Sequence, residues 1–310
     1  MNLLFLIIGL VMLVLGGDWL VKSGVSIAGK FKIPPLIIGL TIVSMGTSMP
    51  ELAVSAKAAL KGYSDLAIGN VIGSNIANIS LILGLTAVII SLPVSRETVV
   101  FTWPVMLFSV VLLWLFTLDY SIQRWEGLIL LLMLPIFIVL LWRRSKNNPE
   151  TQNNEAQGKI YSIGVSLIIL VLSIVCLVYG GNFLIGGAIG IGQSLGISER
   201  TISLTVVAFG TSAPELATSL VAAYRKQTDI SIGNLIGSNI FNIFAILGVT
   251  TIIKPIYVGG TLVHFDIPFN IGIVLLVGLC FIPLKNPKIT RWKGLILAAS
   301  YILYFFLVFK

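Results

Sequence analysis

Long apolar runs separated by short polar segments dominate this chain. Ten of these runs are long enough to cross a bilayer as a helix, since about 20 apolar residues span its hydrocarbon core. Soluble domains carry roughly 25% charged residues, whereas this chain of 310 residues carries only 10% and is 57% hydrophobic. The pattern predicts an all-α integral membrane protein with ten transmembrane helices near residues 3–28, 34–60, 66–91, 99–118, 124–142, 161–190, 198–222, 230–253, 263–284 and 290–309.

One polar stretch divides the chain between its fifth and sixth apolar runs. Residues 144–160 are rich in Asn, Gln, Glu and Lys and poor in apolar side chains, which is typical of a flexible linker. We therefore expect a first five-helix repeat at residues 1–143 and a second at 161–310, joined by a cytoplasmic linker at 144–160.

The two halves resemble each other at a constant offset of 164 residues. TIVSMGTSMPELAVS (41–55) matches TVVAFGTSAPELATS (205–219), and DLAIGNVIGSNIANISLILG (65–84) matches DISIGNLIGSNIFNIFAILG (229–248). Such self-similarity indicates an internal duplication. Because five is an odd number of spans, the second repeat must enter the membrane from the opposite side, which predicts inverted-topology repeats.

The basic residues predict the orientation of these spans, because cytoplasmic loops carry an excess of Lys and Arg. With the linker in the cytoplasm, fourteen of the 20 Lys and Arg residues lie on the cytoplasmic side. Both termini are then expected to be extracellular. The net charge of +8 fits this topology and is not by itself a sign of nucleic-acid binding.

A carboxylate lies within the second apolar run, in the segment Gly46-Thr47-Ser48-Met49-Pro50-Glu51. Ionisable groups at membrane depth are costly and usually functional. Pro50 lacks the N–H that a helix interior needs, so it is expected to break or kink the helix beside Glu51 and to free backbone carbonyls there. The second repeat carries the same segment around Glu215.

Polar side chains recur at spacings of three and four residues along the spans that carry the repeated motifs, which places them on single helix faces. Their polar atoms are hard oxygen donors, without Cys or His, and such ligands suit Ca²⁺ or Na⁺ better than Zn²⁺ or Cu⁺. Two buried glutamates need cations to stay charged, and either one Ca²⁺ or several Na⁺ would serve, which is the logic of an exchanger. The stripes, expected to converge at the centre of the bundle, are Ser44, Thr47, Ser48, Glu51 and Ser55; Asn70, Ser74 and Asn78; Thr211, Ser212, Glu215 and Ser219; and Asn234, Ser238 and Asn242.

Small residues and one further acid accompany these stripes. Gly69, Gly73 and Gly84 are expected to let another helix approach closely. Asp18 lies near a glycine pair in the first span and is a candidate for facing a cavity, although its counterpart in the second repeat is the neutral Asn182.

The paired GTS-x-PE and GN-x-IGSNI-x-N segments resemble the α-repeats of the sodium/calcium exchanger family of cation/calcium antiporters, and the resemblance covers nearly the whole chain. It implies ten helices in inverted repeats and electrogenic exchange of Na⁺ for Ca²⁺ by alternating access at a central site. The implied ligands are Glu51 and Glu215 at the centre, with carbonyls or side chains of Thr47, Thr211, Ser44, Ala208, Ser48, Ser212, Ser74, Ser238, Asn78 and Asn242 around them.

One position departs from part of that family. Some members, including the potassium-dependent branch, carry Asp where this chain has Asn242. One possible negative charge is therefore missing, which predicts transport without a K⁺ requirement. The resemblance implies no prosthetic group and no obligatory protein partner, so the expected partners are Na⁺, Ca²⁺ and the lipid bilayer.

Three other functions are compatible with parts of the pattern. A proton/Ca²⁺ antiporter on the same scaffold is the nearest, because buried glutamates can also carry protons. An intramembrane hydrolase with Ser48 or Ser212 as nucleophile lacks a His or Lys base on the stripes. A channel fits a duplicated, closed carboxylate site less well than alternating access does.

Overall fold

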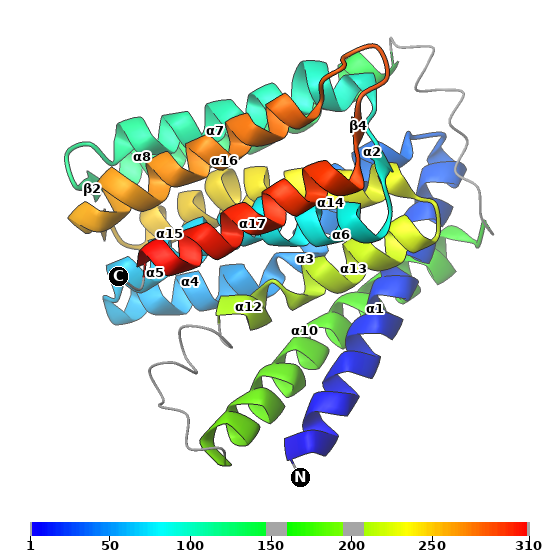
Figure 1. The fold of residues 1–310 in the computed structure, drawn as a ribbon, viewed down its shortest axis with the longest axis horizontal. Coiled ribbons are helices and arrows are strands. Elements are labelled where there is room, and N and C mark those ends of the chain that lie inside the picture. The colour runs from blue at the N-terminus through cyan, green and yellow to red at the C-terminus, as the bar shows by residue number, and fades with distance from the viewer. Residues whose placement is uncertain (1, 147–159, 195–207, 309–310) are drawn as a thin grey trace. The chain divides into compact units, whose positions relative to one another are not determined.

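The computed structural model describes residues 2–146, 160–194 and 208–308 and is helical almost throughout (Figure 1). Eight helices in this part of the chain are long and apolar enough to cross a membrane, and a bent pair, Pro35–Thr47 and Met49–Lys61, makes a ninth candidate. The prediction of a multi-pass helical membrane protein is confirmed. The expected span at 198–222 begins outside the described residues. Most of the expected linker at 144–160 also lies outside them. The eight helices are Asn2–Phe31, Ser64–Ile89, Thr98–Phe116, Arg124–Arg144, Ile163–Ser194, Thr228–Ile253, Leu262–Cys280 and Arg291–Val308.

Several of the candidate spans contain or begin with π-helical turns, at Gly39–Val43, Ala77–Ile82, Thr98–Thr102, Asn242–Leu247 and Leu262–Asp266. The α-helical elements are α1 (Asn2–Phe31), α2 (Pro35–Ile38), α3 (Ser44–Thr47), α4 (Met49–Lys61), α5 (Ser64–Ile76), α6 (Leu83–Ile89), α7 (Trp103–Phe116), α8 (Arg124–Lys146), α10 (Ile163–Ser194), α12 (Ala208–Thr211), α13 (Ala213–Tyr224), α14 (Thr228–Phe241), α15 (Gly248–Ile253), α16 (Ile267–Cys280) and α17 (Arg291–Val308). The described residues also form four two-residue strands: β1 (Leu92–Pro93), β2 (Ser121–Ile122), β3 (Ile256–Tyr257) and β4 (Lys288–Ile289).

The chain forms two compact units, and each unit draws on both halves of the sequence. The first unit comprises Met1–Pro50 and Asn148–Asn234. Within it α1 and α10 lie side by side along their length (Figure 1). Glycines permit this contact: a Cβ added to Gly9 would lie 2.5 Å from the backbone nitrogen of Leu184, and one added to Gly187 would lie equally close to that of Leu6.

The second unit comprises Glu51–Asn147 and Leu235–Lys310, and its helices pack in matched pairs. Helix α6 packs against α17, and α15, the counterpart of α6 in the second repeat, packs against α8. The antiparallel strand pairs β1–β4 and β2–β3 are related in the same way, because each pairs a strand of one half with a strand of the other. Each of these contacts joins a segment of the first half to one of the second.

The three glycines that were expected to let another helix approach differ in their surroundings. A Cβ on Gly84 would lie 2.8 Å from the backbone nitrogen of Ala298 and 2.9 Å from the carbonyl oxygen of Gly294, so the expectation is confirmed there. For Gly69 and Gly73 it is wrong, because no described atom lies within 4 Å of an added Cβ. A glycine in an apolar helix signals a close approach only if a neighbouring backbone lies on that side.

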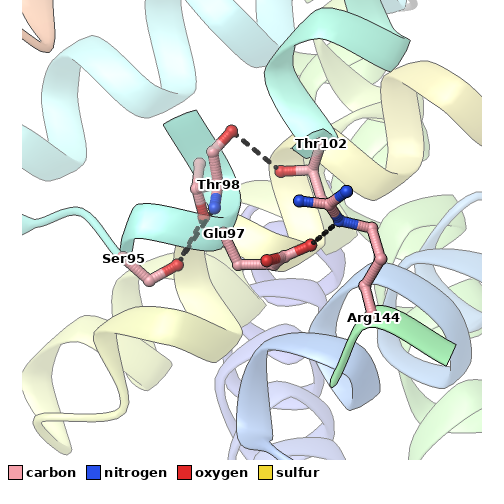
Figure 2. A network of polar contacts seen from close by, with 5 residues as sticks. All are labelled: Ser95, Glu97, Thr98, Thr102 and Arg144. Atoms are coloured by element: carbon pink, nitrogen blue, oxygen red, sulfur yellow. Dashed lines mark hydrogen bonds and ion pairs between the residues drawn. The ribbon is translucent and has the colours of Figure 1, made fainter. Parts of the chain in front are cut away.

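A polar network fixes the start of the span at Thr98–Phe116 within the second unit (Figure 2). The backbone nitrogen of Thr98 donates to Ser95 Oγ at 3.2 Å, and Arg144 Nε donates to Glu97 Oε1 at 2.9 Å. The Arg144 guanidinium also lies 4.9 Å from the centroid of the Phe101 ring. Because Glu97 is buried, its arginine partner offsets the cost of removing the carboxylate from water.

We predict that Gly84→Ala destabilises the protein and that Gly69→Ala does not. The new methyl group at position 84 would overlap backbone atoms of α17, which cannot rotate away as a side chain can, and overpacking of this kind costs about 1–3 kcal/mol. Thermal unfolding of the purified variants in detergent measures the difference. Equal melting temperatures for the two variants would contradict the packing described for α6 and α17.

Candidate functional site

Both glutamate motifs break their helices with the same backbone geometry. Helix α3 ends before Ser48, whose φ and ψ are −86° and 8°, and α13 begins after Ser212, whose values are −87° and 5°. Pro50 and Pro214 are the second residues of the helices that follow, where a missing N–H costs nothing. The predicted break beside each glutamate is confirmed, and the helical segments before and after Ser48 meet at 48°.

Glu51 and Glu215 each lie in the first turn of the helix after the break, and both are fully buried. The first turn of a helix presents N–H groups and the positive end of the helix dipole, which favours a carboxylate by about 0.3–1 kcal/mol. A helix end therefore supplies part of the stabilisation that water would otherwise give. The remaining stabilisation must come from polar neighbours or from cations.

In the first unit, polar side chains of the two repeats form hydrogen bonds with one another. Ser48 Oγ donates to Glu215 Oε1 at 3.1 Å, so a serine of the first motif forms a hydrogen bond with the glutamate of the second. Thr47 Oγ1 donates to Asn234 Oδ1 at 3.1 Å, and Asn234 Nδ2 in turn donates to Ser219 Oγ at 3.0 Å. Buried hydrogen bonds in series hold such side chains in one arrangement.

In the second unit, one carboxamide contacts the segment that follows Glu51, and further carboxamides are buried in the same unit. Asn70 Nδ2 donates to Ser55 Oγ at 3.0 Å and to the Glu51 carbonyl at 3.4 Å. Asn242 Nδ2 donates to Asn75 Oδ1 at 3.0 Å. Neither side-chain polar atom of Asn78 has a hydrogen-bond partner among the described residues, although the residue is fully buried.

The twelve predicted site residues divide between the two units. Within the first unit the structure brings Ser48 to Glu215 and Thr47 Oγ1 to the Ser44 carbonyl, at 3.2 Å. Ala208 begins α12, and its side chain lies outside the description. The other eleven are all buried: Ser44, Thr47, Ser48, Thr211, Ser212 and Glu215 in the first unit, and Glu51, Ser74, Asn78, Ser238 and Asn242 in the second.

Sequence reasoning missed two buried amides and the π-helical turns beside them. Asn75 and Asn239 occupy the same position in the repeated GSNI segments, so their repetition was the available signal. The turns at Ala77–Ile82 and Asn242–Leu247 also occupy nearly matching positions. Such π-helical turns are frequent at functional sites because they shift backbone and side-chain directions, but no residue type marks them in the sequence.

Asp18 forms ion pairs at the end of the α1–α13 contact in the first unit. Its carboxylate lies 2.7 Å from Lys22 Nζ and also pairs with Arg225, the residue that follows α13. The side chain is mostly buried and has two cationic partners, so the structure supports an ion-paired role for Asp18 and not that of an isolated acid facing a cavity.

The donor set of the motifs is rich in neutral oxygen atoms and poor in charge. No group of three or more His, Cys, Asp or Glu side chains that could hold a metal occurs in the described part of the chain. Any cation bound at the motifs must therefore rely on hydroxyls, amides and carbonyls beside few carboxylates, as hard cations do. A multi-pass helical protein with such buried donors at broken helices belongs to the class of membrane transporters for cations.

Comparison with known proteins names the family. A family model described as sodium/calcium exchanger protein matches residues 1–143 and 165–310. The chain belongs to this family, whose members are transporters and not enzymes, and the resemblance of the repeated motifs is thereby confirmed.

Relatives of nearly equal length support the assignment. The sodium/calcium exchanger MaX1 of Methanosarcina acetivorans is 32% identical, covering 99% of this chain and 98% of the relative. The putative antiporter CaxA of Alkalimonas amylolytica is 38% identical over the same shares. A solved structure of the sodium-calcium exchanger NCX_Mj aligns with a TM-score of 0.84 and 31% identity, covering 99% of this chain and 98% of that one.

We predict that Ser48→Ala lowers the stability of the ion-free protein by about 1–2 kcal/mol, while Ser212→Ala leaves it nearly unchanged. Ser48 donates to a buried carboxylate, whereas Ser212 Oγ has no hydrogen-bond partner among the described residues. Thermal unfolding in buffer with a Ca²⁺ chelator and without Na⁺ measures both. The two serines are equivalent in the repeat, so equal losses would contradict the Ser48–Glu215 contact.

Proposed function

We propose that this protein is a secondary active antiporter that exchanges Na⁺ for Ca²⁺ by alternating access, moves net charge and needs no K⁺. The observation that carries the proposal is the duplicated break motif, which twice places a buried glutamate at the start of a helix among neutral oxygen donors. Membership of the sodium/calcium exchanger family and the likeness to the exchanger NCX_Mj support it.

The proposed architecture has ten membrane-spanning helices in two inverted repeats, with both termini extracellular. The contacts of the second unit support this arrangement, because α6–α17 corresponds to α15–α8, and β1–β4 to β3–β2, when the halves are exchanged. The excess of Lys and Arg on one side supports the orientation. A reporter fused to either terminus that is active in the cytoplasm would contradict it.

In the proposed site Glu51 and Glu215 act together as ligands shared by Ca²⁺ and Na⁺. Two carboxylates balance one Ca²⁺, and the neutral donors offer coordination for more Na⁺ than the two that would match its charge, so the exchange moves net charge. An empty site would lose the cation charge that balances its two carboxylates in low dielectric, which discourages transport without an ion. The neutral donors are the carbonyls or side chains of Ser44, Thr47, Ser48, Ser74, Asn78, Ala208, Thr211, Ser212, Ser238 and Asn242.

We predict that proteoliposomes loaded with Na⁺ take up ⁴⁵Ca²⁺ when diluted into Na⁺-free medium, and that Glu51→Gln and Glu215→Gln each reduce uptake at least 100-fold. Each substitution removes half of the charge that pairs with Ca²⁺ while preserving shape. Glu97→Gln is the matched control: Glu97 is also a buried glutamate but pairs with Arg144, outside the repeated motifs, so uptake should persist.

The same vesicles distinguish the proton-coupled alternative. A protonophore should leave Na⁺-driven uptake intact. Uptake that responds only to an imposed pH gradient, and not to Na⁺, would assign the two glutamates to proton exchange and overturn the proposed coupling.

We predict that replacing K⁺ with choline on both sides of the membrane leaves Na⁺-driven Ca²⁺ uptake unchanged within about twofold. Asn78 and Asn242 are both amides, so the site lacks the additional carboxylate that a further cation would need for charge balance. Transport that stops without K⁺ would contradict this reading of position 242.

A further inference from the structure

Four asparagines form a buried set in the second unit, and the duplication relates them in pairs. Asn75 corresponds to Asn239, and Asn78 corresponds to Asn242. All four side chains are fully buried. Asn78 and Asn242 are proposed ligands, whereas nothing so far assigns a role to Asn75 or Asn239.

The hydrogen bonds of Asn75 have a direction that the backbone determines. The carbonyl oxygen of Asn239 can only accept, and Asn75 Nδ2 donates to it at 3.3 Å. Asn75 therefore presents its Oδ1 on the other side, where it accepts from Asn242 Nδ2 at 3.0 Å. Asn242 must in turn direct its Oδ1 away from Asn75. The oxygen and nitrogen of an isolated side-chain amide can be exchanged by rotating the amide group. A series of hydrogen bonds that starts at a backbone carbonyl permits only one of the two orientations for each amide in it.

The amide oxygen of Asn242, at the end of this series of hydrogen bonds, has no hydrogen-bond partner among the described residues. Asn242 Oδ1 is buried and accepts no hydrogen bond among the described residues. A buried acceptor without a partner costs about 1–3 kcal/mol. A cation that coordinates this oxygen would recover that cost, and a cation that met the NH₂ group would be repelled.

The equivalent pair after exchange of the repeats, Asn239 and Asn78, is arranged differently. Asn239 Nδ2 donates to the Leu235 carbonyl of its own helix at 2.8 Å, and Asn239 Oδ1 has no partner in the described structure. Neither polar atom of the Asn78 side chain has one either. The orientation of Asn242 is therefore imposed by Asn75, while no described side chain imposes an orientation on Asn78.

We propose that Asn75 is a positioning residue for cation binding: it holds Asn242 so that the amide oxygen faces the transported cation. The inference rests on the proposed function, in which Asn242 is a ligand. It also accounts for the residue type at position 242, because a group that faces Asn75 Oδ1 must donate a hydrogen bond. An amide does so without charge and contributes a neutral oxygen to the site.

A double-mutant cycle on Ca²⁺ affinity tests the proposal in the full-length protein. The dissociation constant is measured by calorimetry in Na⁺-free detergent solution for Asn75→Ala, Asn242→Ala and the double variant. Asn75→Ala should weaken binding about 3–10-fold, the equivalent of one hydrogen bond. The double variant should bind no more than about twofold more weakly than Asn242→Ala, because Asn75 acts only through Asn242.

The duplication provides the matched control. Asn239→Ala and Asn78→Ala occupy the equivalent positions without the equivalent hydrogen bond, so their effects on affinity should multiply in the double variant. Wild-type affinity in Asn75→Ala, or effects that multiply in both cycles, would overturn the proposal. If Asn75→Ala does not fold, Asn75→Ser replaces it, since it also removes the amide oxygen that Asn242 needs.

These measurements separate a failure of the proposed exchange from a failure of the role given to Asn75. A wild-type protein that binds no Ca²⁺ would overturn the exchanger function and this inference with it. A wild type that binds and exchanges Ca²⁺ while the two cycles behave alike would overturn only the role of Asn75.

Discussion

The cost of a carboxylate without water is the constraint on which this structure depends. Glu51 and Glu215 are fully buried, and Glu51 lies in a bent pair of helices that together are long and apolar enough to cross a membrane. Each lies at the start of a helix after a break, where exposed N–H groups and the helix dipole favour negative charge. The proline after each break allows the new helix to begin there. Helix ends and oxygen donors reduce the cost, and in the proposed function bound cations supply the remainder.

Duplication gives the chain two sets of the same chemical groups, but the structure uses them unequally. Ser48 donates to Glu215, whereas its counterpart Ser212 has no hydrogen-bond partner among the described residues. Asn242 is held by Asn75, and Asn78 has no such support. A symmetric sequence therefore produces asymmetric hydrogen bonding. Equivalent positions provide internal controls for each other, because they share residue type and burial and differ in contacts.

The membrane class, most spans and both helix breaks could be predicted, because they follow from local properties: hydrophobic length, and a proline beside a buried carboxylate. Which of Gly69, Gly73 and Gly84 would meet a neighbouring helix could not be predicted, because that depends on which distant backbone lies opposite each glycine. Asn75 was overlooked for a related reason. Its importance lies in a bond to Asn242, 167 residues further along the chain, and in the carbonyl that orients it. The convergence of all twelve candidate ligands on one central site remains a prediction.

The contact between Gly84 and α17 has a consequence for biosynthesis. The helix with which α6 packs begins at Arg291, far along the chain from α6, so α6 is synthesised well before its partner. The face of α6 at Gly84 therefore stays without this neighbour until α17 has been made. The second unit cannot close in the order of synthesis, and a chain that loses α17 would leave α6 without its backbone partner.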